Sequence, residues 1–178
     1  MSKSPSEHRR VLAIDPTSRG FGFVLLEGSH RLVDWGVAHT REDKHRRCLA
    51  RVSDLIDQYD PEVIVLEDGA GRGSRRCGRV RQLLKEIQGL AMNLDITTRR
   101  YSRSELRHAF AEAGARTKHE IAKAIAGRFP ELASRLPPFR KPWMSEDDRM
   151  SIFDALGLAL TMLHFEHRSS KASRGPHH

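Results

Sequence analysis

The sequence predicts an α/β protein whose mixed five-stranded sheet has three antiparallel strands followed by parallel ones, with helices flanking it. Residues 10–14, 20–28 and 31–38 are apolar runs of strand length separated by turn-forming segments, so they predict two successive hairpins. Two further strand-like runs, at 63–66 and 95–101, each follow a segment with helical periodicity. Right-handed crossovers through those helices would add the later strands parallel to the first.

Two amphipathic helices are expected between these strands. In residues 45–60 apolar side chains recur every three or four positions, and Pro61 ends the pattern because the residue before a proline disfavours helical angles. Residues 80–94 show the same apolar spacing, with charged residues on the opposite face. Each helix therefore has one face that must be covered.

Two capping boxes predict helix starts later in the chain. Ser102 precedes Glu105 by three residues, and Thr117 precedes Glu120 by three residues. In this motif the hydroxyl accepts a backbone N–H bond and the glutamate accepts one in return. After a proline-rich segment, a last helix is expected over about 146–164.

The length and composition fit one folded domain. The chain has 178 residues, of which 38% are hydrophobic and 30% charged, and this composition excludes a disordered chain. We expect the folded domain at 10–165, with polar flexible tails at 1–9 and 166–178, the second of them basic.

No segment has the composition of a membrane span or a secretory signal. The longest apolar stretch, 156–165, is interrupted by polar residues and is shorter than the roughly 18 residues that a span needs. The N-terminal residues have no apolar core after their charges. Cys48 and Cys77 are too few for a disulfide framework and lack the spacing of a zinc site. We therefore expect a cytoplasmic protein without a membrane partner.

Basic residues are concentrated in the middle of the chain. The formal net charge is +8, and residues 68–118 contain 12 Lys and Arg against five Asp and Glu, which gives +7 for this window alone. Such an excess suits a polyanion such as nucleic acid, although a solvated surface is the alternative. The candidate contacts to DNA phosphates are five arginines of one segment: Arg72, Arg75, Arg76, Arg79 and Arg81.

Two acidic residues end strands that are expected to be neighbours. Asp15 follows the apolar run of the first strand, and Glu67 ends the run VIVLE. Their carboxylates would converge at one edge of the sheet, where a hard divalent cation relieves the repulsion between them. Taken singly, either acid could instead end a strand in water.

Asp154 is harder to explain by folding alone. It lies in the run SIFDALGLAL, which is apolar on most of the helix circumference. A bare carboxylate there costs on the order of several kcal/mol unless it is paired or bound to a metal. Asp154 is therefore a third candidate ligand, and a buried acid satisfied by Arg or Ser is the alternative.

Together these motifs resemble the RuvC family of Holliday junction resolvases, in the RNase H-like superfamily. The resemblance covers roughly residues 10–165 and rests on IDPTSRGFG at the first strand, VIVLE before a basic loop, and FDALGLAL in the last helix. It implies a metal-dependent, structure-selective endonuclease that hydrolyses phosphodiesters at four-way or other branched DNA. It also implies a homodimer formed through the helix at 80–94, for which packing on its own sheet is the alternative.

The resemblance further implies the roles of individual residues. Asp15, Glu67 and Asp154 match the family's ligands for two magnesium ions, and Mn²⁺ is expected to substitute for Mg²⁺. Lys118 matches a basic residue near the family's site, where it would neutralise charge on the scissile phosphate, unless it is simply an exposed helix lysine.

The chain departs from the family pattern at three places. It has Thr17 where the family usually has glycine, and Ser151 where the family usually has a carboxylate. Glu67 is followed by Asp68 and three small residues, at the place where the family carries an aromatic wedge that helps to open the junction. Arginines are the expected substitutes for that wedge.

Asp147 is the predicted replacement for the carboxylate missing at Ser151. On an ideal helix it lies only about 20° around the axis from Asp154, whereas Asp148 lies about 120° away. A helix that begins later than Glu146 would relax this geometry and make Asp148 the alternative fourth ligand.

Three other functions share part of this pattern. An RNase H-like nuclease acting on RNA or on non-junction DNA would use the same ligands. A catalytically inactive nucleic-acid-binding module is favoured if Ser151 marks a lost ligand. A sugar-kinase or actin-like ATPase fragment also opens with a strand, an Asp and a Gly-containing turn, but its second domain does not fit in 178 residues.

Overall fold

The five predicted strands form one mixed sheet. The computed structural model describes residues 8–41, 43–69 and 76–173. The strands are β1 (Arg10–Pro16), β2 (Gly20–Glu27), β3 (Arg31–His39), β4 (Val63–Glu67) and β5 (Thr97–Tyr101). Their order across the sheet is β3-β2-β1-β4-β5, with β1, β2 and β3 antiparallel and β4 and β5 parallel to β1. The predicted fold class is therefore confirmed.

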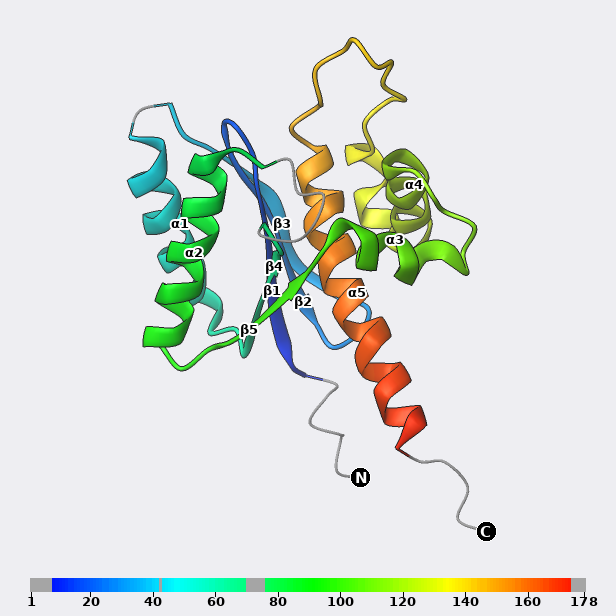
Figure 1. Ribbon diagram of the computed structural model, residues 1–178, viewed down its shortest axis with the longest axis horizontal. Helices are drawn as coiled ribbons and strands as arrows, with labels where there is room; N and C mark the ends of the chain where they lie inside the picture. Colours follow the sequence, from blue (N-terminus) through cyan, green and yellow to red (C-terminus); the bar gives the residue numbers. More distant parts are fainter. Residues whose placement is uncertain (1–7, 42, 70–75, 174–178) are drawn as a thin grey trace.

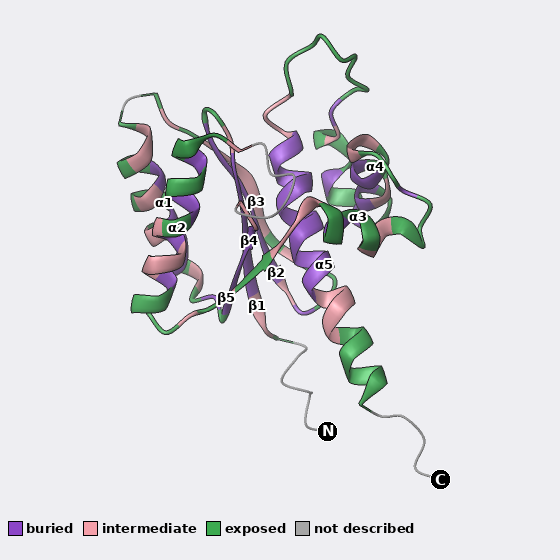
Figure 2. Cartoon of the chain, viewed as in Figure 1, coloured by how far each residue is buried: buried purple, intermediate pink, exposed green. Residues whose placement is uncertain are grey.

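Helices cover both faces of this sheet. They are α1 (Lys44–Tyr59), α2 (Gly78–Asn93), α3 (Arg103–Ala111), α4 (Lys118–Arg128) and α5 (Met150–Ala172), with a short 3₁₀ helix η2 (Pro130–Arg135). Helices α1 and α2 lie on one face, and α5, backed by α3 and α4, lies on the other (Figure 1). Buried residues accordingly fill the central strands and the first half of α5 (Figure 2).

The alternation of side chains along β1 determines which face each residue reaches. Val11 and Ala13 belong to the core beneath α5, whereas Leu12 and Ile14 belong to the core beneath α1 and α2. Because successive strand residues point to opposite faces, Asp15 points to the α5 side. The same alternation in β4 directs its last residue, Glu67, to that side as well.

Helix α2 packs its apolar face on the sheet of its own chain. The buried residues of this helix are Val80, Leu83, Leu84, Ile87 and Ala91. All five belong to the core that includes Leu12 and Ile14 of β1. The apolar spacing in this segment is thus explained by folding within one chain, and a homodimer through α2 stays a prediction.

The last helix differs from its expected bounds at both ends. It begins at Met150 rather than near Glu146, because the Asp147 carboxylate accepts the backbone N–H of Arg149 at 2.9 Å and holds a turn there. It continues to Ala172, so residues 166–172 are helical rather than part of the expected tail. The hydroxyls of Ser169 and Ser170 donate to carbonyls one turn earlier in this extension. Within the described ranges, no helix has the length and apolar character needed to cross a membrane.

Helix α5 approaches β2 closely at Gly22. This residue pairs with Asp15 of β1, and a Cβ added to it would lie 2.3 Å from Ser151 Oγ and 2.5 Å from Ser151 Cβ. Real Cβ atoms do not approach other atoms so closely. The absence of a side chain at Gly22 therefore allows α5 to lie directly on the sheet beside Asp15.

We predict that Gly22→Ala lowers the free energy of unfolding by about 1–3 kcal/mol, the usual cost of overpacking a well-filled core. The matched control is Gly89→Ala in α2, where an added Cβ meets no atom within 4 Å and should stabilise the helix by about 0.5–1 kcal/mol. Urea denaturation followed by circular dichroism measures both changes. A Gly22→Ala variant as stable as the wild type would contradict the close packing of α5 on β2.

Candidate active site

Three buried carboxylates lie at the same edge of the sheet, on the face covered by α5. Asp15 in β1 is 2% exposed, Glu67 at the end of β4 is 4% exposed, and Asp154 in α5 is 6% exposed. β1 and β4 are adjacent and parallel, with Ile14 paired to Leu66, so their carboxyl ends meet as the sequence predicted. The acids are thus brought together by the sheet register and by the seating of one helix.

Arg76 connects the two acids of the strands. Its Nη2 donates to Asp15 Oδ1 at 2.5 Å, and its Nε donates to Glu67 Oε2 at 2.7 Å. Its Nη1 donates to the Pro16 carbonyl at 2.8 Å. Sequence analysis assigned Arg76 to DNA phosphates, but in the structure its guanidinium is turned inward against the carboxylates.

Arg103, the first residue of α3, contacts all three acids. Its Nη1 donates to Asp154 Oδ1 at 2.9 Å. Its Nε lies 3.4 Å from Glu67 Oε1, and its Nη2 lies 3.7 Å from Asp15 Oδ1. One guanidinium group therefore lies in the volume that the three carboxylates share.

Arg103 is the main site residue that sequence analysis missed. Glu67 pairs with Tyr101 at the end of β5, so the segment after β5 emerges at the same edge as the acids. The capping box at Ser102, which the structure confirms, then fixes Arg103 as the first helical residue beside them. The sequence feature that could have identified Arg103 is a basic residue directly after a helix cap that itself follows a parallel strand.

Lys118 lies at the site, as the resemblance implied. The second predicted capping box is also confirmed: Thr117 caps α4, and Lys118 is its first residue. The Nζ of Lys118 is 2.7 Å from Asp154 Oδ2 and also bonds Glu146, which sequence analysis did not single out. The Lys118 side chain, which is 39% exposed, thus contacts the buried Asp154 and remains open to solvent.

The balance of burial and charge differs between the acids. Burial raises the pKa of Asp15 to about 7, although Arg76 opposes this rise, and the negative charge of Asp154 adds to it. Burial also acts to raise the pKa of Asp154, but Arg103 and Lys118 outweigh it and bring that pKa below its ordinary value. Burial therefore dominates the pKa of Asp15, whereas the neighbouring cations dominate the pKa of Asp154.

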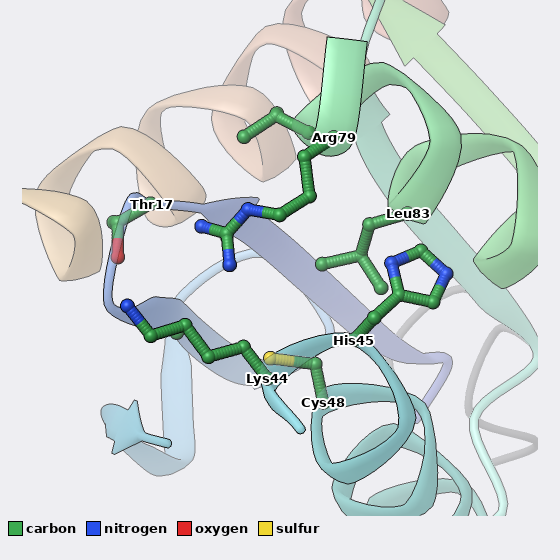
Figure 3. Close-up of a pocket in the computed structure, with 8 residues that line it drawn as sticks. Thr17, Lys44, His45, Cys48, Arg79 and Leu83 are labelled. Atoms are coloured by element: carbon green, nitrogen blue, oxygen red, sulfur yellow. The ribbon is translucent and has the colours of Figure 1, made fainter. Parts of the chain in front are cut away.

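The other predicted DNA-binding arginines have varied positions. Arg72 and Arg75 lie outside the described residues. Arg79 extends toward the turn between β1 and β2 and donates to the Ser18 carbonyl at 2.7 Å, beside a small pocket that Thr17 and Lys44 also line (Figure 3). Arg81 is exposed on α2 and lines a separate pocket.

The acids before α5 make contacts of their own. Arg149 donates to both carboxylate oxygens of Asp147, at 2.9 and 2.6 Å. Asp148 lies 3.4 Å from Arg19 Nη1 and 3.8 Å from His39 Nδ1. Because α5 begins at Met150, the ideal-helix angle that favoured Asp147 over Asp148 does not apply. Neither residue is among the acids that Arg103 contacts.

The chemistry of the donor set fits a divalent cation. Carboxylate oxygens are the ligands that Mg²⁺ prefers, and Asp15, Glu67 and Asp154 surround one common volume. In the part of the chain that the structure describes, no three His, Cys, Asp or Glu side chains form a ready cluster for a metal ion. A cation bound by the three acids therefore requires Arg76 and Arg103 to give up their contacts with them.

Comparisons with known proteins relate the chain to crossover junction endodeoxyribonucleases. No protein-family model matches the chain. The crossover junction endodeoxyribonuclease RuvC of Pelodictyon phaeoclathratiforme is 28% identical over 159 residues, which cover 84% of this chain and 77% of that protein. RuvC of Citrifermentans bemidjiense is 25% identical over 134 residues, or 69% of this chain and 82% of that protein. In sequence, the chain is therefore similar to RuvC endodeoxyribonucleases over most of its length.

Solved structures of Holliday junction resolvases share the fold. T. thermophilus RuvC, in complex with a Holliday junction substrate, superposes with a TM-score of 0.67 at 20% identity, covering 90% of this chain and 96% of that one. The yeast mitochondrial Holliday junction resolvase gives a TM-score of 0.63 at 14% identity, over 89% of this chain and 79% of that one. The family resemblance stated from sequence motifs is therefore confirmed.

We predict that Asp15 makes the free energy of unfolding of this protein fall as the pH rises toward 7. A carboxyl group with a pKa of 3.8 when unfolded and about 7 when folded holds its proton more tightly in the folded state. Its stabilising contribution is present below the unfolded value and is lost as pH rises through the folded value. Between pH 4 and 8, the free energy of unfolding should fall on the order of a few kcal/mol more in the wild type than in Asp15→Asn.

Urea denaturation in EDTA at a series of pH values measures this difference. Glu112→Gln, at an exposed carboxylate in the ion pair with Arg168, is the matched control and should follow the wild type. If stability depends on pH in the same way in the wild type and in Asp15→Asn, Asp15 has the same pKa in the folded and unfolded states, and the prediction is wrong.

Proposed function

We propose that the protein is a metal-dependent, structure-selective endonuclease that hydrolyses phosphodiesters at four-way DNA junctions. The observation that carries this proposal is the convergence of three buried carboxylates, from β1, β4 and α5, around one guanidinium group. Its RuvC relatives are named crossover junction endodeoxyribonucleases, and a RuvC structure of the same fold is in complex with a Holliday junction. We place this activity in the cytoplasm, in association with branched DNA.

Asp15, Glu67 and Asp154 are the proposed ligands of two Mg²⁺ ions, which Mn²⁺ could replace. When bound, such ions stabilise the charge that develops on the attacking and leaving oxygens of a phosphodiester. The carboxylates, held by the ends of two strands and one helix, fix where that stabilisation acts. Their burial also lowers the local dielectric and so strengthens the electrostatic interactions of the site.

The basic residues have complementary roles in this proposal. Lys118 touches Asp154 and is partly exposed, so its ammonium group can neutralise charge on the scissile phosphate. Arg76 and Arg103 can exchange a carboxylate partner for a phosphate, because a guanidinium binds both with the same paired geometry. Phosphates of the junction arms are the proposed partners of the arginines in one segment: Arg72, Arg75, Arg76, Arg79 and Arg81.

A homodimer is part of the proposal. A four-way junction offers two equivalent strands, and a twofold dimer would bring one site to each of them. The surface proposed for this contact is α2, where Met92 and Leu94, at the C-terminal end of the helix, are exposed apolar residues.

One observation favours a second candidate function, an inactive nucleic-acid-binding protein. Asp15, Glu67 and Asp154 already have Arg76, Arg103 and Lys118 as cationic partners. The position of the family's further carboxylate holds Ser151, whose hydroxyl donates to the Asp148 carbonyl at 2.5 Å. Such a protein would bind a junction and leave it intact.

We predict that the wild type cuts a synthetic four-way junction with Mg²⁺ and not with EDTA. Asp154→Asn should slow single-turnover cleavage roughly 100-fold or more, the scale of losing a group that stabilises the transition state, while junction binding persists. Glu112→Gln serves as the control for removing a carboxylate elsewhere on the surface. Binding by the wild type without cleavage under all metal conditions would favour the inactive protein instead.

We propose Asp147 as the fourth ligand, with Asp148 as the alternative. Single-turnover cleavage by Asp147→Asn and Asp148→Asn, measured separately, distinguishes them, because only the ligand's variant should need more Mg²⁺ to reach its maximal rate. The expected loss in metal affinity is at least roughly 10-fold, because even the loss of a group that only supports a ligand typically costs 10- to 100-fold. A rise in metal requirement for Asp148→Asn alone would transfer the role to Asp148, and no change in either variant would remove both.

A further inference from the structure

The loop between η2 and α5 exposes two large aromatic side chains. We call residues 137–144 the aromatic loop. In it, Phe139 is 72% exposed, Trp143 is 78% exposed, and Met144 is 48% exposed. The loop extends away from the helices at the top of Figure 1, and its exposed residues are green in Figure 2.

Folding of the chain does not explain why these rings are exposed. Phe and Trp contribute most to stability when packed, and nearly all other large apolar side chains of the described chain are at least partly buried. Arg140 donates to the Met144 carbonyl, so the loop has an internal bond that does not bury either ring. Rings held out in water within five residues of each other mark an interaction surface.

The charge of the loop indicates the kind of partner. Residues 137–144 include Arg140 and Lys141 and no Asp or Glu. The Nζ of Lys141 lies 5.3 Å from the centre of the Trp143 ring, so a cation and an aromatic surface are presented together. Alternating rings and cations are what proteins use to bind single-stranded nucleic acid, because bases stack on the rings and phosphates bind the cations.

The aromatic loop is continuous with the carboxylate site. One open pocket of about 690 Å³ is lined by Lys118 and Glu146 and also by Phe139 and Met144. Lys118 is the residue that contacts Asp154. The Phe139 ring also packs edge-on against His119, the next residue of α4, at 5.5 Å between ring centres. A strand bound at the acids would therefore pass the aromatic loop.

We propose that the aromatic loop binds unpaired nucleotides of the branched DNA, with bases stacked on Phe139 and Trp143 and phosphates held by Arg140 and Lys141. This inference rests on the proposed function, which supplies branched DNA as the substrate. It adds a site at which separated strands would bind. It occupies a different part of the chain from the segment after Glu67, which is where the absent aromatic wedge was expected. A single-stranded segment is favoured over a protein partner because the loop is positively charged and adjoins the acids.

The test uses fluorescence of two probes bound to the full chain. One is a four-way junction with 2-aminopurine at the crossover, in Ca²⁺ to allow binding without cleavage, and the other is oligothymidine with a fluorescent end label. Trp143→Ala and Phe139→Ala should each weaken oligothymidine binding roughly ten-fold, the scale of losing one stacked base. Each should also reduce the 2-aminopurine signal of the bound junction. Trp143→Phe, which keeps a ring, should retain most of the affinity.

Val33→Ala is the control, because Val33 is an exposed apolar residue on β3. Wild-type affinity for oligothymidine in both loop variants would overturn the proposal, as would a loss in Trp143→Ala together with an equal loss in Val33→Ala. If Trp143→Ala changes the oligomeric state seen by sedimentation but leaves DNA binding unchanged, the loop makes a protein contact, and this result would also overturn the proposal.

The outcomes separate this inference from the proposed function. If the wild type binds oligothymidine through the aromatic loop but cuts no junction with Mg²⁺, the endonuclease proposal fails and the binding surface stands. If the wild type cuts junctions, and the loop variants bind and cut as it does, the binding surface fails and the endonuclease stands.

Discussion

The interaction on which this structure most depends is the one between three buried carboxylates and the guanidinium of Arg103. Acids placed in an apolar interior repel each other and lose hydration, so their burial needs a compensating charge close to all of them. Arg103 provides it because a planar group with several donors can face Asp15, Glu67 and Asp154 at once. Arg76 and Lys118 complete the charge balance from two other directions.

That cluster explains much of the surrounding architecture. The close approach of α5 to Gly22 brings Asp154 down to the sheet, and the parallel register of β1 with β4 aligns the two other acids. Three segments that are distant in sequence must therefore be in place before the acids meet. The site is a consequence of tertiary packing. A shift of any one of these segments therefore changes the distances between the acids.

The fold and the acids could be predicted from the sequence, whereas most of their cationic partners could not. Apolar periodicity and the two capping boxes predicted the strands and helices, because both signals depend on local geometry. Asp154 was recognisable because an acid in an apolar helix lacks a local explanation. Arg103 and Arg76 have ordinary surface explanations in the sequence, and only the folded chain shows that they turn inward. The later start of α5 likewise depends on a side-chain contact, between Asp147 and Arg149, that periodicity does not reveal.

The two capped helix starts have a further electrostatic consequence. Arg103 and Lys118 are the first residues of α3 and α4, and both contact Asp154, so two helices begin within one side-chain length of the same carboxylate. Aligned peptide dipoles give each N-terminus the equivalent of roughly half a positive charge. Unlike a side chain, this charge cannot rotate away or lose a proton. These two partial charges therefore offset part of the negative charge of Asp154, even when both cationic side chains are engaged elsewhere.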